Sequence, residues 1–198
     1  APSIIPSETG LFRDSATVKS DARSIVGDAE TREDELFTIL ERTASEAGWH
    51  VFRASNPDQI SSYIVSLVKR LGADTLLRSD HDVFSHVDIE SRLSSIGTEL
   101  TRMTINSGDD PDVRRSSLRQ IATEAKIAVT GVDYGIAETG SCVLLASESV
   151  SRLVALLPPV HVAIVMKSQV IEHLEDLFTL RREAFIDGRL GSYMNIIS

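Results

Sequence analysis

The clearest pattern of apolar and polar positions lies between residues 56 and 72. Apolar side chains recur there at the spacing of one face of a helix. Asn56 is a preferred N-cap residue, and Pro57 fits a first helical turn, where its missing N–H costs nothing. Gly72 fits the left-handed position that follows a helix. The pattern therefore predicts a helix over residues 57–71.

The rest of the chain alternates between weaker helical patterns and short apolar runs. Helices are predicted over residues 31–47, 87–96 and 110–124, and from residue 168 onward. Strands are predicted over residues 49–54, 73–77, 98–105, 127–130, 142–146, 160–166 and 194–197. The connections are too short for antiparallel hairpins, so consecutive strands are expected to run parallel. The predicted fold class is α/β, with a mostly parallel sheet and helices on both faces.

The first 28 residues differ from the rest in composition. They mix Pro, Ser, Thr, Asp and Gly with scattered apolar side chains and show no clear period. Residues 1–28 are therefore expected to form a flexible N-terminal arm. Residues 29–198 are expected to form a single α/β domain, since a chain of 198 residues suits one domain.

The charge of the chain restricts its partners. It carries 29 Asp and Glu against 20 Lys and Arg, a formal net charge of −9. Such a chain repels phosphate backbones at long range, which argues against nucleic acids and anionic membranes as partners. A small anionic ligand held by local backbone amides stays compatible with this charge.

The single cysteine, Cys142, begins an apolar strand. One cysteine forms no internal disulfide and holds no cluster alone, which favours a reducing compartment. No secretory segment is recognisable, and the apolar runs are shorter than a membrane span. A cytoplasmic location is expected.

Chemistry-bearing residues gather at the ends of two predicted strands. Thr130 and Asp133 lie at the end of strand 127–130, where α/β sheets bind ligands. Before strand 142–146, a glycine and two hydroxyls could align backbone amides and donors around a carboxylate or phosphate. These ligand-binding candidates are Thr139, Gly140 and Ser141.

Glu138 stands beside this predicted anion site and would repel its ligand. It fits there as a base, as a nucleophile or as an anchor for a cation or hydroxyl, which makes it the catalytic candidate. The structural alternative is that its carboxylate only ties down backbone amides of the turn. Both readings stay open from the residues alone.

Histidines offer fewer candidates. His161 opens a buried strand and is either a hydrogen-bonded core residue or a ligand-binding residue that faces the cleft. His81, Asp82, His86 and Asp88 lack a known metal-ligand spacing, so no metal site is predicted. Nucleotide-binding glycine motifs and the serine-hydrolase elbow are absent from the sequence.

Two stretches of the sequence resemble a known family. "TGVDYGIAETGSCVLL", residues 130–145, and "LPPVH", residues 157–161, are similar to the LUD-domain family, in the lactate-utilisation protein C (LutC/YkgG-like) group. The resemblance is specific over about the C-terminal half. Family members continue into a Gly-Pro-Ser segment after the last strand, so the C-terminal end of the family domain is expected to be absent after Ser198.

The resemblance implies a fold like that of NagB, RpiA and the CoA-transferases. It also implies a part in oxidising L-lactate to pyruvate together with iron–sulfur partner subunits, with no cofactor bound by this chain itself. A small anionic ligand is the expected partner, and a homo-oligomer is compatible with the pattern. Two alternatives remain: a CoA-transferase-like enzyme with Glu138 as nucleophile, and a non-catalytic ligand-binding or scaffold protein.

Overall fold

The computed structural model describes residues 14–103, 111–145, 153–189 and 194–198. The helices are α1 (Ser15–Thr31), α2 (Glu33–Glu46), α3 (Pro57–Leu71), α4 (Glu90–Ser94), α5 (Pro111–Glu124), α6 (Leu153–Leu156) and α7 (Leu174–Ile186), with 3-10 turns η1 (Asp82–Ser85) and η2 (Lys167–Gln169). The strands are β1 (Thr75–Arg78), β2 (Glu99–Arg102), β3 (Ile127–Gly131), β4 (Tyr134–Ile136), β5 (Ser141–Leu145), β6 (Val160–Ile164), β7 (Val170–Ile171) and β8 (Met194–Ile197).

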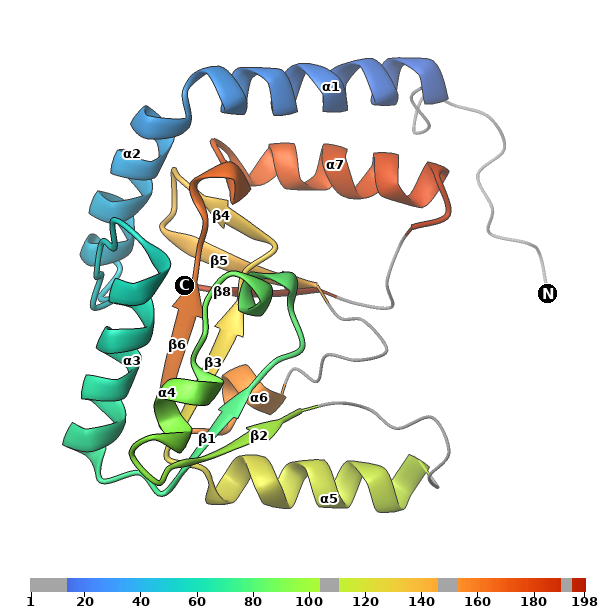
Figure 1. Cartoon of the computed structure of the whole chain (residues 1–198). Coiled ribbons are helices and arrows are strands. Elements are labelled where there is room, and N and C mark those ends of the chain that lie inside the picture. The colour runs from blue at the N-terminus through green and yellow to red at the C-terminus, as the bar shows by residue number, and fades with distance from the viewer. Residues whose placement is uncertain (1–13, 104–110, 146–152, 190–193) are drawn as a thin grey trace.

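Four parallel strands form the first sheet, in the order β2-β1-β3-β6 (Figure 1). One face buries Leu76 and Ile127 against α3 and α4. The opposite face buries Leu77 and Ala128 against α5 and α6. Both faces are thus covered, as parallel sheets require. The α/β fold class predicted from the alternating pattern is confirmed.

A second sheet, in the order β7-β4-β5-β8, was not predicted. Its strands β4 and β5 form an antiparallel hairpin, and β5 pairs antiparallel with β8. The expectation that the connections exclude hairpins is therefore wrong here. Strand β4 has only three residues, too few to show an alternating pattern in the sequence. Helices α1 and α7 cover one face of this sheet around Ile136 and Val143.

The N-terminal residues differ from the expected arm. Residues 15–28 belong to helix α1, which lies along α7 (Figure 1) and buries Val18 and Ala22. Residues 1–13 lie outside the described part of the chain. Within the described residues, no helix is long and apolar enough to cross a membrane.

The prediction was wrong in two further places. The stretch predicted as strand 49–54 pairs with none of the described strands and forms an extended segment between α2 and α3. Helix α7 begins at Leu174 rather than after Ser168, because residues 167–171 form η2 and the short strand β7 first. By contrast, α3 has the predicted limits, with the side chain of Asn56 capping it and Gly72 left-handed at its end.

Helix α2 packs tightly against the turn between β4 and β5. The hydroxyl of Thr43 donates a hydrogen bond of 2.7 Å to the carbonyl oxygen of Ala137. Gly140 has φ +70°, and a Cβ at this position would lie 2.3 Å from the backbone nitrogen of Ala44. A glycine is thus required twice at this position, for its backbone conformation and for the close approach of α2.

We expect Gly140→Ala to lower the free energy of unfolding by about 3 kcal/mol. Left-handed strain contributes about 1–2 kcal/mol and overpacking against α2 about 1–3 kcal/mol. The matched control is Gly188→Ala, because Gly188 has φ +69° but open space around its Cβ position. The free energy of unfolding of Gly188→Ala should fall only by the cost of the left-handed strain. Urea unfolding followed by circular dichroism measures both, and equal losses would show that α2 does not press on Gly140.

Candidate functional site

The predicted site residues do not meet in one cavity. Glu138 and Thr139 are exposed on the turn between β4 and β5. Thr130 and His161 lie on β3 and β6 of the parallel sheet, and Asp133 follows β3. The structure therefore separates the candidates into three places.

The carboxylate of Glu138 binds the beginning of α7. One oxygen accepts a 2.7 Å hydrogen bond from the backbone N–H of Leu174, and the other lies 2.8 Å from Nδ1 of His173. The hydrogen bond from Leu174, which is the larger cause, and the one from His173 hold the pKa of Glu138 below its ordinary value. The same contact raises the pKa of His173. An ionised acid at a helix N-terminus is also favoured by the helix dipole.

Two backbone amides of the turn are already bonded within the protein. The N–H of Glu138 donates to the carbonyl of Glu172, and the N–H of Gly140 donates to the carbonyl of Ile136. The glycine conformation is used for packing against α2, as described above. The anion cradle predicted at residues 138–141 therefore lacks two of the donors it would need.

The hydroxyls of the turn form a chain that leads away from Glu138. Thr139 donates to Ser141 at 2.8 Å, and the buried hydroxyl of Ser141 lies 2.6 Å from that of Ser198. Ser198, which sequence reasoning did not single out, lines a groove around the edge strand β6. Its partner lies 57 positions earlier, so no local sequence signal could reveal the contact.

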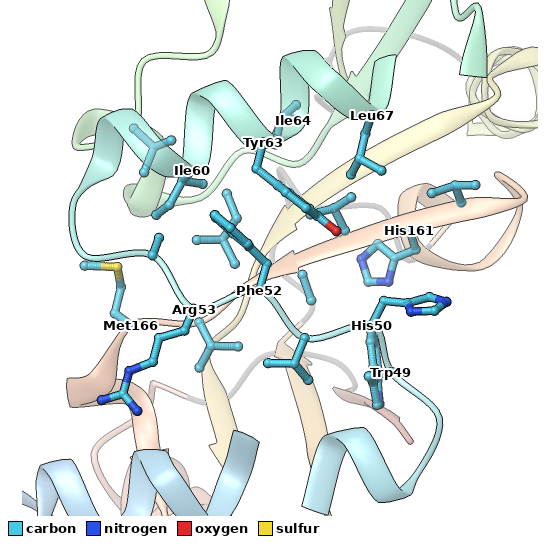
Figure 2. Close-up of a pocket in the computed structure, with 18 of the residues that line it drawn as sticks. Trp49, His50, Phe52, Arg53, Ile60, Tyr63, Ile64, Leu67, His161 and Met166 are labelled. Atoms are coloured by element: carbon cyan, nitrogen blue, oxygen red, sulfur yellow. The ribbon is translucent and has the colours of Figure 1, made fainter. Parts of the chain in front are cut away.

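This groove has a volume of about 1300 Å³ and contains the predicted residue His161 in its lining (Figure 2). It lies between α3, β6 and the segment of residues 47–56, and His161 and Trp49 line one end. The Trp49 and His161 rings meet edge to face, with centroids 6.4 Å apart. Glu138 does not line the groove.

His161 is mostly buried and bonded to Thr130. Its Nε2 lies 2.8 Å from the hydroxyl of Thr130. Burial lowers the pKa of His161 to about 4, so the ring is neutral at physiological pH. When the hydroxyl donates to Nε2, Nδ1 carries the ring proton. A neutral donor of this kind suits hydrogen bonding to a ligand better than charge pairing.

Asp133 forms the third place, beyond β3. Its carboxylate accepts a 2.7 Å hydrogen bond from the N–H of Leu145 and lies 4.0 Å from Nε2 of His81. Desolvation raises the pKa of Asp133. His81 packs directly on Gly131, where a Cβ would lie 2.1 Å from the ring. Among the residues that the structure describes, no group of His, Cys, Asp and Glu could hold a metal ion.

Comparison with known proteins identifies relatives over most of the chain. A family model described as the LUD domain matches residues 38–198. Lactate utilization protein C of Shouchella clausii is 27% identical over 170 residues, which cover 85% of this chain and 69% of that protein. Lactate utilization protein B of Bacillus velezensis is 24% identical over 213 residues, which cover 83% of this chain.

The lengths of these relatives differ from that of the chain. The chain spans 45% of the B protein of Bacillus velezensis and 44% of that of Bacillus pumilus, which is 22% identical. A solved structure of a DUF162 family protein from Deinococcus radiodurans is 16% identical, with a TM-score of 0.38, and covers 73% of this chain and 90% of its own.

We expect Glu138→Gln to lower the pKa of His173 toward its ordinary value, because the neutral amide no longer favours the imidazolium. Glu138 has a lowered pKa, so its contribution to stability is lost as the pH falls below about 4.5, and that of His173 is lost as the pH rises above about 6.5. NMR titration of the His173 ring measures the change. Glu35→Gln, which does not touch His173, is the control. An unchanged His173 pKa in Glu138→Gln would contradict the pairing.

We also expect the free energy of unfolding to fall as the pH drops from about 6.5 to 4 because of His161. A histidine that is neutral in the folded state takes up a proton on unfolding in this pH range. This proton uptake stabilises the unfolded state relative to the folded state. Replacement by Gln keeps a polar side chain without this titration. Urea unfolding should therefore show a shallower pH dependence for His161→Gln than for the unchanged protein. Parallel curves for the two proteins would show that His161 titrates normally.

Proposed function

The chain belongs to the LUD domain family, and on that premise we propose that it takes part in the utilisation of lactate. The observation that carries the proposal is the match of the family model to residues 38–198. Relatives named lactate utilization proteins B and C support it, each matching more than four fifths of this chain. This chain spans less than half the length of the B proteins. A share in the activity of those whole proteins is therefore part of the proposal.

We further propose that the redox step uses iron–sulfur clusters held outside this chain. A cluster takes about four cysteine thiolates. This chain supplies one, Cys142, which is buried, and burial raises the pKa of its thiol to about 12. Such a thiol is protonated at neutral pH and is a poor ligand. A partner subunit with its own cysteines would carry the electrons from lactate.

The His161 end of the groove is the proposed place for a small carboxylate. The ring of His161 and the hydroxyl of Ser198 both line it. Asp and Glu are absent from its lining among the described residues, although the chain as a whole is acidic. A carboxylate would therefore meet hydrogen-bond donors without a facing negative charge.

The alternative, a CoA-transferase-like reaction with Glu138 as nucleophile, has less support. The hydrogen bonds of Glu138 stabilise its charge, and the carboxylate lies outside the groove. A nucleophile needs an open lone pair beside a bound substrate. A structural role for Glu138 at the start of α7 explains its contacts more simply.

Deletion of the gene is expected to abolish growth on L-lactate as the sole carbon source and to leave growth on glucose unchanged. The intact gene should restore growth, and so should the exposed control His86→Ala. Titration calorimetry with L-lactate should show binding that His161→Gln weakens at least about tenfold. Normal growth of the deletion strain on lactate would overturn the role in lactate utilisation, and equal binding by both proteins would overturn the site.

A further inference from the structure

Strand β6 ends the parallel sheet with an unprotected edge. It is the last strand in the order β2-β1-β3-β6, and its sequence, Val-His-Val-Ala-Ile, carries no charged side chain. The opposite edge strand, β2, has Arg102 bound to Glu90. Proteins commonly protect sheet edges with charges, because a bare edge pairs with other chains. Strand β6 lacks that protection.

The register of β6 shows which backbone groups are free. Val132 donates its N–H to the carbonyl of Ile164, which directs the backbone of Ile164 toward β3. In a parallel ladder the next residues alternate, so the N–H and C=O groups of His161, Ala163 and Val165 point away from β3. Among the described residues, no hydrogen bond to the backbone groups of His161 or Ala163 occurs outside the sheet.

The groove that surrounds this edge has room for another strand. Its volume of about 1300 Å³ exceeds the 300–1,000 Å³ that is usual for small-molecule sites. The five residues of β6 extend over about 16 Å. A second strand along β6 would place alternate side chains toward α3 and toward Trp49.

Both sides of the groove offer apolar contacts. On the α3 side, Phe52 stacks on Tyr63 with ring centroids 4.3 Å apart, and Ile60 and Leu67 lie beside them (Figure 2). Phe52 is 47% exposed, so part of its ring stays open to an apolar contact in the groove. The segment that carries it makes no backbone hydrogen bond from residue 50 to residue 54 with any described residue.

The charge of the groove opposes that of the whole chain. Its charged lining residues are cations, Arg53, Arg70 and Lys167, whereas the net charge of the chain is −9. Glu41 pairs with Arg53, and Asp34 pairs with Lys167. Arg70 is exposed and has no carboxylate partner among the described residues. The groove thus favours an occupant with apolar side chains and a negative charge.

From these observations we propose that β6 receives an extended peptide segment of a partner protein, with apolar residues at alternate positions and an acidic residue beside them. The peptide adds a strand to the sheet, and its backbone bonds the free groups of His161, Ala163 and Val165. Strand addition of this kind draws affinity from backbone hydrogen bonds and specificity from alternate side chains. The proposal goes beyond the role in lactate utilisation and does not depend on a ligand at His161.

A displayed library of random seven-residue peptides, selected on the whole protein, tests the proposal. Selected peptides should share alternating apolar residues and at least one Asp or Glu. They should not be enriched on Phe52→Glu, but should be enriched on Phe178→Glu, since Phe178 is 49% exposed on α7 outside the groove. Similar peptides from the Phe52→Glu variant, or no enrichment on the unchanged protein, would overturn the proposal.

A synthetic copy of the best peptide then tests the backbone bonds. N-methylation of every second residue removes the donors on one edge of the added strand, and N-methylation of the other set removes those on the far edge. Only one set should weaken binding, by at least about tenfold in fluorescence anisotropy, because two or three hydrogen bonds are lost. Equal binding by both methylated peptides would mean that side chains alone hold the peptide and would overturn strand addition.

The charge contribution has its own matched pair. Arg70→Glu should weaken binding several-fold and reduce its dependence on salt, because the exposed guanidinium lies beside the acidic residue of the peptide. Arg119→Glu makes the same change on the exposed surface of α5 and should leave binding unchanged. Equal effects of the two variants would show that only the net charge of the chain attracts the peptide. The acidic residue would then not belong to the proposed partner. Light scattering that shows dimers, lost in Phe52→Glu but kept in Phe178→Glu, would instead make a second copy the occupant and overturn the proposal.

Discussion

The contact of α2 with the turn between β4 and β5 determines how the second sheet lies relative to the groove. Thr43 bonds the carbonyl of Ala137, and Gly140 lets the backbone of α2 approach without a Cβ between them. Helix α2 leads directly into the segment that forms one wall of the groove. The same contact leaves Glu138 on the outer side of the turn, where it reaches α7. One close approach thus positions both regions that carry chemistry.

These two regions differ in their electrostatic character. The carboxylate of Glu138 and the ring of His173 form an exposed pair in which each favours the charged form of the other. His161 lies in an apolar setting that favours its neutral form. The hydroxyls of Thr139, Ser141 and Ser198 link the neighbourhoods by hydrogen bonds that carry no charge. The arrangement assigns ionic contacts to the outer surface and neutral donors to the groove.

Sequence reasoning was most reliable where the determinants are local. Helix α3 is specified by a cap, a first-turn proline and a final glycine within sixteen positions of each other, and the structure has the predicted limits. The parallel strands follow from apolar runs between helices. The family resemblance rests on two short motifs and is confirmed by the match of the LUD domain model. Each of these signals can be recognised in one stretch of sequence.

Features that depend on contacts between distant positions have no such local signal. Glu138 bonds Leu174, which lies 36 positions later, so its role at a helix start has no local signal. Residues 49–54 have the composition of a strand but find no paired neighbour among the described strands, because pairing depends on tertiary position.

Cys142 is buried on β5, between β4 and β8, and this position has a practical consequence. Cys142 is the single cysteine of the chain, and its surroundings protect the thiol. An alkylating reagent would react with it only when the second sheet opens. The rate of labelling would therefore report the rate of that opening without any engineered probe.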